Sequence, residues 1–370
     1  MSLPGLPPGV SSRRIDNGNG LVMHVLEAGP EDAPLLLLLH GFPELAYSWR
    51  KVMPLLAAAG HRVVAPDQRG YGLTTGWTAD YDDDLAPYRM TNLVTDALGL
   101  VTALGRTRVT AVIGHDFGSP VAAWCGLIRP DVFRAVVMMS APFAGPPSLP
   151  RPAPDEAIHR ALAALPRPRK HYQGYYATRA ADADMRYAPQ GLAAFLRAYY
   201  HVKSADWPDN RPHPLPGWTA EALATLPTYY VMDRDRTMAE TVAPHAPSPE
   251  EAAACSWLTE AELAVYAESF ARTGFQGGLD WYRCGVDPEI AGALALFSGR
   301  RIDVPATFVA GAADWGVYQV PGAFEAMATR ASSDFRGATL IEGAGHWVQQ
   351  EQPERTAAAV LAFLEGCANR

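Results

Sequence analysis

The sequence predicts an α/β fold in which a mostly parallel sheet is flanked by helices and carries a mainly helical insertion. Short apolar runs alternate with helical patterns through residues 1–143 and again through 298–370, the spacing of a doubly wound parallel sheet. Between these parts, residues 144–297 lack such runs and are rich in proline, tyrosine and helix-like stretches. We therefore expect one core built from 1–143 and 298–370, with 144–297 inserted as a helical unit.

The expected core begins with strand-like segments. Residues 14–25 carry an Asn-Gly turn between two of them. Short, mostly apolar runs follow, and such runs suit buried parallel strands: 35–39, 63–65, 109–113 and 135–139. Thr91 is expected to cap a helix that Gly105 ends, and residues 122–128 have a helical composition.

Helix-like stretches at 191–200 and 259–272 dominate the inserted part. The strand pattern resumes at 306–310 and 339–341, and residues 356–364 predict a closing helix. Parallel sheets of this kind bind ligands beyond the carboxyl ends of their strands. Polar residues that directly follow a predicted strand are therefore the first candidates for chemistry.

Composition, charge and cysteine spacing exclude several classes of protein. The chain has 370 residues, 48% of them hydrophobic, and a net charge of -8. It has no basic run, so no nucleic-acid partner is expected. Its four cysteines lie far apart, which predicts neither a disulfide framework nor a zinc site. The apolar run 35–39 is too short to span a membrane, and the first ten residues do not read as a signal peptide. No membrane association is expected, and a cytoplasmic location is the simplest interpretation.

Asp116 is the first candidate catalytic residue. Residues 111–120 read as an apolar strand, a tight turn with Gly114 and Gly118 on either side of the acid, and the start of a helix. This is the pattern of a nucleophile elbow, which lifts one side chain above the sheet. A carboxylate there attacks sp3 carbon and forms an alkyl ester, which suits epoxides and alkyl halides. The alternative is that Asp116 is only a helix N-cap.

Two later residues complete a candidate triad with Asp116. Asp314 follows a predicted strand and a run of small residues, and His346 stands between Gly345 and Trp347. The chain order of acid nucleophile, second acid and histidine is the order of triads on this kind of sheet. His346 would activate a water, and Asp314 would hold its imidazole in the required tautomer. Taken alone, Asp314 could be a turn residue and His346 an ordinary polar residue. Their order along the chain after Asp116 favours a catalytic role.

With these motifs the chain resembles the α/β-hydrolase fold and, within it, the soluble-type epoxide hydrolases, from about residue 14 to 366. His40-Gly41-Phe42-Pro43-Glu44 matches the H-G-x-P loop of that family. The resemblance implies that the backbone N–H groups of Phe42 and Phe117 form an oxyanion hole.

The resemblance also implies two tyrosines of the insertion as acids for the leaving oxygen. Tyr172 stands in a Tyr-Gln pair early in the insertion, which matches one family motif. Tyr282 stands late, in a Trp-Tyr-Arg segment after the Gly-Phe-x-Gly turn at 274–277, which matches the other. The remaining tyrosines of the insertion are expected to pack.

By this resemblance the chain would convert a small hydrophobic epoxide and water to a vicinal diol, with no metal or organic cofactor. Four apolar residues are expected to line the substrate pocket: Pro43, Phe143, Trp281 and Trp347. Phe117 has no donor to hold a halide, unlike the tryptophan common in haloalkane dehalogenases. A dehalogenase and a non-catalytic ligand-binding relative remain as alternatives. The particular epoxide, the enantiomer preference and the quaternary state stay open, with a homodimer through the insertion as the candidate assembly.

Overall fold

The computed structural model describes residues 3–149 and 156–368, and its centre is an eight-stranded sheet in the order β1-β2-β4-β3-β5-β6-β9-β10. The second strand, β2 (Val22–Ala28), runs antiparallel to both β1 (Val10–Asp16) and β4 (Arg62–Pro66). Every other pairing in this sheet is parallel. The predicted mostly parallel α/β sheet is therefore confirmed.

The apolar runs of the sequence form the strands. The other strands of this sheet are β3 (Leu35–Leu39), β5 (Ala111–His115), β6 (Val136–Met139), β9 (Ala306–Gly311) and β10 (Phe335–Ile341). All but β10 in that group are buried along their whole length, which explains why they are apolar without alternation. The edge strand β10 is largely exposed.

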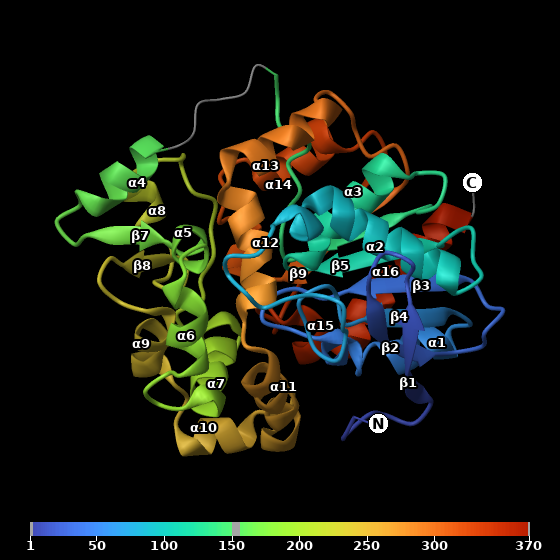
Figure 1. The fold of residues 1–370 in the computed structure, drawn as a ribbon, viewed down its shortest axis with the longest axis horizontal. Helices are drawn as coiled ribbons and strands as arrows, with labels where there is room; N and C mark the ends of the chain where they lie inside the picture. Colours follow the sequence, from blue (N-terminus) through green and yellow to red (C-terminus); the bar gives the residue numbers. More distant parts are fainter. Residues whose placement is uncertain (1–2, 150–155, 369–370) are drawn as a thin grey trace.

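Helices cover both faces of the sheet (Figure 1). On one face, α2 (Met90–Ala103) and α3 (Gly118–Ile128) pack together in a hydrophobic core that continues into the inserted part. On the other face, α1 (Met53–Ala58) and α16 (Pro353–Ala368) enclose a second core. Two short helices complete this part: α14 (Ala323–Ala326) and α15 (Val348–Glu351).

The predicted start of α2 is wrong and its predicted end is right. Arg89, not Thr91, is the N-cap residue, and its side chain makes no capping hydrogen bond. A 3-10 turn at Ala86–Tyr88 leads directly into the helix, so the backbone is already helical at Thr91. Gly105 follows the helix with a φ of 69°, a conformation that glycine adopts without steric cost.

Residues 144–297, which lie between β6 and β9, are called the insert below. Its helices are α4 (Glu156–Ala163), α5 (Tyr172–Tyr176), α6 (Ala180–Arg186), α7 (Leu192–Lys203), α8 (Ala220–Leu223), α9 (Met238–Val242), α10 (Pro249–Ala254), α11 (Glu260–Thr273), α12 (Gln276–Val286) and α13 (Pro288–Ala293). The predicted stretches 191–200 and 259–272 correspond to α7 and α11. Residues 150–155, in the proline-dense part, lie outside the described residues.

The insert also contains a two-stranded antiparallel ribbon, β7 (Arg169–His171) with β8 (Val231–Asp233). The sequence did not predict it, because three residues are too few to display an alternating pattern. The insert occupies one half of the molecule and the sheet the other (Figure 1). We propose that residues 144–297 form a cap domain over the carboxyl ends of the strands.

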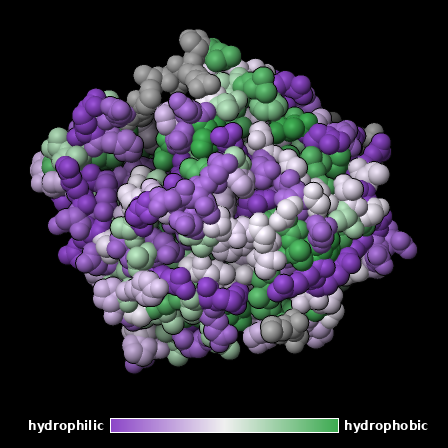
Figure 2. Space-filling model, in the orientation of Figure 1, coloured by the Kyte–Doolittle hydropathy of each residue, from purple (hydrophilic) through white to green (hydrophobic). Residues whose placement is uncertain are grey.

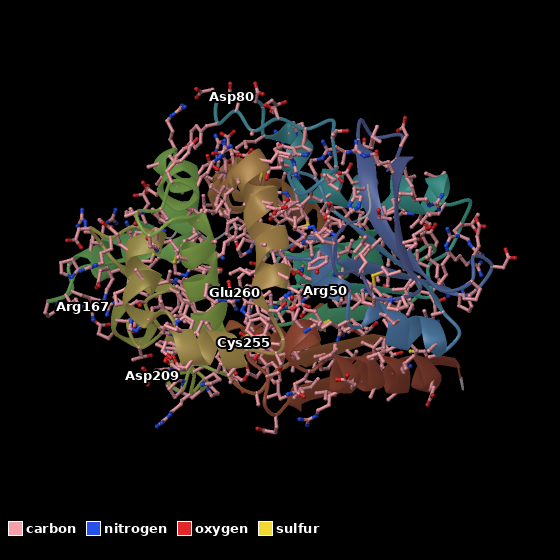
Figure 3. All side chains as sticks on the ribbon, turned by 90° about the horizontal axis from the view of Figure 1, so that it is seen from below. Arg50, Asp80, Arg167, Asp209, Cys255 and Glu260 are labelled. Atoms are coloured by element: carbon pink, nitrogen blue, oxygen red, sulfur yellow. The ribbon has the colours of Figure 1, made fainter. Side chains whose placement is uncertain are left out.

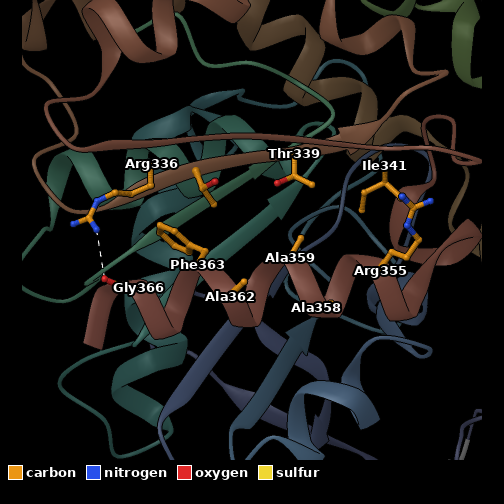
Figure 4. A pocket seen from close by; sticks show the side chains of 10 residues that line it. Arg336, Thr339, Ile341, Arg355, Ala358, Ala359, Ala362, Phe363 and Gly366 are labelled. Carbon is orange, nitrogen blue, oxygen red and sulfur yellow. Dashed lines mark hydrogen bonds between the residues drawn. The ribbon is translucent and has the colours of Figure 1, made fainter. Parts of the chain in front are cut away.

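The outer surface is mainly hydrophilic on the face drawn in Figure 2, where hydrophobic residues appear in small groups between polar ones. A hollow of about 560 Å³ lies between β10 and α16, with Arg336 at one end and Arg355 at the other (Figure 4). None of the candidate catalytic residues lines it. Within the described ranges, no helix is both long and apolar enough to cross a membrane.

Candidate active site

Asp116 stands in the sharp turn between β5 and α3, with a φ of 51°. A non-glycine residue with positive φ is uncommon and marks a constrained, often functional position. The flanking glycines allow the turn. A Cβ on Gly114 would lie 1.9 Å from the carbonyl oxygen of Gly118, and a Cβ on Gly118 would lie 2.3 Å from that of Leu39. The backbone thus has the form of the predicted elbow.

The Asp116 carboxylate is held by one backbone amide and one imidazole. Phe42 N–H donates to its Oδ1 at 2.9 Å, and His346 Nε2 donates to its Oδ2 at 3.1 Å. A Cβ on Gly41 would lie 2.3 Å from the Asp116 Cβ, so the loop after β3 approaches closely only because residue 41 is glycine. Phe117, the other predicted oxyanion donor, follows Asp116 directly, but its amide makes no hydrogen bond to this carboxylate.

His346 joins Asp116 to Asp314. The imidazole Nδ1 lies 3.0 Å and 3.2 Å from the two carboxylate oxygens of Asp314, and Gly316 N–H donates to the same carboxylate at 2.7 Å. Asp314 follows β9 and His346 follows β10, two adjacent parallel strands. Residues far apart in sequence therefore meet in one line of hydrogen bonds at the carboxyl edge of the sheet.

Buried charges set the protonation of these three residues. Burial disfavours ionised Asp116, but the hydrogen bond and positive charge of His346, with the charge of Lys203, outweigh it and hold the pKa of Asp116 well below its usual range. Burial and Lys203 lower the pKa of His346, whereas Asp314 and Asp116 raise it, to about 9. Despite burial, the pKa of Asp314 is lowered by His346. In the resting state Asp116 is thus a carboxylate paired with an imidazolium.

Tyr172 and Tyr282 face the same region from two helices of the insert. Tyr172 begins α5, Tyr282 lies within α12, and their ring centroids are 6.0 Å apart. The Tyr282 ring lies 5.5 Å from that of Phe42 and 5.1 Å from that of Phe117. Burial, followed by the negative charge of Asp116, raises the pKa of both phenols above its ordinary value. Both therefore keep their protons at neutral pH.

The two phenols differ in their hydrogen bonds. Tyr172 donates to Gln319 Oε1 at 3.1 Å and accepts from Gln173 Nε2 at 3.3 Å. The Tyr282 hydroxyl has no hydrogen-bond partner in the described part of the chain. Helix α12 comes close enough to place Tyr282 there because Gly277 meets Gly70 of the core, where a Cβ on Gly277 would lie 2.4 Å from the Gly70 Cα.

Three of the four predicted pocket residues lie around this group. The Trp281 ring packs 5.2 Å from Phe117, and the Trp347 ring packs 4.7 Å from His346. Pro43 follows Phe42, and its carbonyl accepts the Tyr200 hydroxyl at 2.7 Å. Phe143 instead packs against the Trp124 ring, with the two ring centroids 5.6 Å apart.

Sequence reasoning missed a buried pair beneath the site. His115 Nδ1 donates to Glu44 Oε2 at 2.6 Å, and His115 Nε2 donates to the His346 carbonyl at 2.6 Å. Glu44 also accepts the Gly41 N–H at 3.1 Å. The pair thus ties together the loop after β3, the elbow and the His346 loop. Glu44 lies within the H-G-x-P segment 40–44 and His115 directly precedes Asp116, and these positions were the only signal for them.

Two further tyrosines, expected only to pack, stand close to the candidate acids. The Tyr176 ring lies 5.0 Å from the Tyr282 ring, and its hydroxyl donates to that of Tyr199 at 3.1 Å. Lys203 follows Tyr199 by four residues on α7, the spacing that puts both on one helix face.

Among the described residues, no group of three or more His, Cys, Asp or Glu side chains could hold a metal ion.

Known proteins with the same organisation identify the family. The alpha/beta hydrolase fold family matches residues 34–196. Epoxide hydrolase A of Mycobacterium tuberculosis is 32% identical over 367 residues, which cover 97% of this chain and 98% of the relative. The chain belongs to the epoxide hydrolase family. Epoxide hydrolase 2 of Siraitia grosvenorii is 30% identical, with 94% and 96% covered.

Solved structures of the family agree in fold. An epoxide hydrolase from an endophytic Streptomyces has a TM-score of 0.79 at 32% identity, over 98% of this chain and 97% of that one. Epoxide hydrolase A from Mycobacterium thermoresistibile has a TM-score of 0.77 at 34% identity, over 96% and 98%. These comparisons confirm the predicted α/β-hydrolase fold and the predicted family. They also confirm the predicted enzyme class, an epoxide hydrolase.

Proposed function

We propose that the enzyme converts an epoxide and water to a vicinal diol through a covalent hydroxyalkyl ester on Asp116. The observation that supports this most directly is the arrangement around that carboxylate. Asp116 is ionised, in contact with His346, and faced by two buried phenols that keep their protons. An ionised carboxylate opposite proton donors suits displacement at carbon with an oxygen leaving group.

In the first step, Tyr172 and Tyr282 hydrogen-bond the epoxide oxygen while Asp116 attacks one ring carbon. A carboxylate C–O bond forms, the epoxide C–O bond breaks, and the leaving oxygen takes a proton from a tyrosine. The His346 imidazolium then loses its proton and the phenolate regains one, so that the ester-bearing enzyme has a protonated tyrosine and a neutral histidine. The Tyr282 hydroxyl is free to bind the epoxide oxygen, whereas the Tyr172 hydroxyl turns from Gln319 Oε1 to do so. General acid catalysis of this kind contributes on the order of 10²–10⁴ in rate.

In the second step, His346 takes a proton from a water that attacks the ester carbonyl carbon. Asp314 stabilises the resulting imidazolium, with which it already forms hydrogen bonds. The amide of Phe42, which donates to Asp116, and that of Phe117, the next residue, are proposed to stabilise the oxyanion. The bond between the carbonyl carbon and the diol oxygen then breaks, that oxygen takes a proton from the imidazolium, and the diol leaves. The Asp116 carboxyl group gives its proton to His346, which restores the resting carboxylate and imidazolium. The apolar walls of Pro43, Trp281 and Trp347 suit a hydrophobic substrate.

Intact-mass measurement with an aryl epoxide such as styrene oxide tests the scheme. His346→Gln should accumulate an adduct of the substrate mass on Asp116, because the ester forms but its hydrolysis lacks a base. Asp116→Asn, which keeps the side-chain shape, should form none and should show no turnover. If His346→Gln stays unmodified, the two-step scheme is wrong. Halide release from haloalkanes or haloacetates, with no diol from epoxides, would instead assign a dehalogenase.

A further inference from the structure

Lys203 is a buried cation with no part in the bond-making steps proposed above. It ends α7 and is 4% exposed. Its Nζ lies 5.1 Å from the Tyr230 ring centroid, 5.3 Å from Tyr199, 5.5 Å from Trp347 and 5.9 Å from Tyr229. Aromatic faces attract an ammonium at these distances. No carboxylate of the described residues forms an ion pair with it, so its charge must be compensated from further away.

The end of α7 is joined firmly to the loop that carries His346. His346 N–H donates to the Lys203 carbonyl at 2.8 Å. The buried Glu351 carboxylate accepts the N–H groups of Ala205 at 2.8 Å, Gly345 at 2.9 Å and Trp347 at 3.0 Å. The Lys203 backbone is therefore fixed relative to the His346 loop, and the rings of Tyr199, Tyr230 and Trp347 surround its ammonium.

Two negative and two positive groups interact at His346 in the resting enzyme. Asp116 and Asp314 are negative, and His346 and Lys203 are positive. Glu44 and His115, which also face this region, pair with each other and take no part in the proposed reaction. Glu351, whose pKa burial raises to about 7, accepts backbone N–H groups on either side of His346 and is not changed by the reaction. When Asp116 becomes an ester it loses its negative charge. The positive charge of Lys203 and the negative charge of Asp314 then cancel only if His346 is neutral. A neutral imidazole is the form that can accept a proton from water.

We propose that Lys203 is a positioning residue whose ammonium drives His346 into its neutral, proton-accepting form once Asp116 carries the ester. This inference rests on the proposed function. The direction of the effect is supported in the resting enzyme, where Lys203 lowers the pKa of both His346 and Asp116. Lys203 thus favours the ionised nucleophile in the first step and the neutral base in the second.

Lys203→Met tests this, with Lys170→Met as a matched control. Lys170 lies 4.7 Å over the Tyr175 ring on the insert, so both variants replace a lysine that contacts an aromatic ring. Ester formation and hydrolysis are followed by rapid quench and intact mass from about pH 6 to about pH 10. Lys203→Met should form the ester, but the midpoint of hydrolysis should move up by about one pH unit, with hydrolysis roughly tenfold slower at neutral pH. Lys170→Met should match the unaltered enzyme.

NMR titration of the His346 imidazole in the resting enzyme gives a second readout that does not need the ester. The midpoint should rise by about one pH unit in Lys203→Met, and Lys203→Arg should restore it. Lys203→Gln replaces the Met variant if thermal melting shows that the latter is not folded. Absence of the adduct in His346→Gln would refute the proposed function, while the titration still decides the action of Lys203.

Three outcomes would overturn the inference. The first is an unmoved midpoint in both measurements. The second is a loss of hydrolysis that is equal at every pH, which would mark a purely structural role for Lys203. The third is a loss confined to carboxylate-bearing epoxides, with neutral epoxides unaffected, which would make Lys203 an anion-binding residue of the pocket instead.

Discussion

At the scale of single residues, Asp116 combines a constrained backbone with a stabilised negative charge. Its positive φ is held by its place between β5 and α3, and its carboxylate contacts Phe42 N–H and His346. The same side chain could have been only a helix cap, as the sequence allowed. The N-cap residue of α3 is instead Phe117, and the Asp116 side chain turns to the His346 imidazole.

Removing both candidate acids should prevent ring opening. The double variant Tyr172→Phe with Tyr282→Phe should form the Asp116 ester at least about 10²-fold more slowly, since no phenol remains to protonate the leaving oxygen. Tyr175→Phe is the control, because its hydroxyl donates to Asp184 at 3.0 Å. Single-turnover rates of ester formation measure the effect. Near-normal rates in the double variant would assign the acid to another group.

Ester hydrolysis should depend on pH with a midpoint below that of the resting enzyme. Burial and Lys203 lower the pKa of His346, but the carboxylates of Asp314 and Asp116 raise it to about 9. Esterification removes the Asp116 charge, so the pKa of His346 should fall. The hydrolysis rate should therefore rise with pH and level off below about pH 9, as single-turnover measurements would show. A midpoint at or above 9 would contradict this mechanism.

At the scale of elements, the nucleophile elbow depends on glycine at two flanking positions. Gly114 is the last residue but one of the buried strand β5, and its missing side chain leaves room for the Gly118 carbonyl. Strand, turn and helix could be predicted from sequence because each uses a strong local pattern. The β7–β8 ribbon and the start of α2 could not, because three-residue strands and a preceding 3-10 turn leave no distinct pattern.

Gly114→Ala should disrupt the elbow. Its Cβ would meet backbone atoms at 1.9 Å, which no rotamer change can relieve, so we expect a loss of at least about 3 kcal/mol in the free energy of unfolding. Gly285→Ala in α12, where a Cβ meets nothing within 4 Å, is the control and should be neutral or slightly stabilising. Urea denaturation measures both. Equal stability of the two variants would show that the turn can relax.

At the scale of the whole molecule, the insert is tied to the core by a buried arginine. Arg50 follows the 3-10 turn Ala46–Trp49 and is 1% exposed. Its guanidinium donates to Glu262 and to the Trp257 carbonyl in the insert, and to Gln350 on α15 of the core. Figure 3 shows Arg50 where the insert meets the sheet-containing half. Because the insert and the core both contact this one buried guanidinium, we expect it to favour a single orientation of the insert relative to the core.

Arg50→Met should loosen this junction. Loss of a buried, multiply bonded cation should cost about 3 kcal/mol, because Gln350 and the Trp257 carbonyl lose their donor. The surface pair of Arg13, whose side chain is 49% exposed, with Glu27 provides the control, and Arg13→Met should cost under about 1 kcal/mol. Urea unfolding monitored by fluorescence distinguishes them. Comparable losses in the two variants would mean that Arg50 does not stabilise the junction.

The sequence by itself determined the sheet, the helical insertion, the elbow and the identity of Asp116, Asp314 and His346 as candidates. These features are encoded in short windows of hydrophobic pattern and glycine placement, which the local backbone requires. Only the tertiary structure decided which side chains meet. It brought Lys203 to the His346 loop and left Phe143 against Trp124, since contacts between distant segments depend on packing that no local pattern specifies.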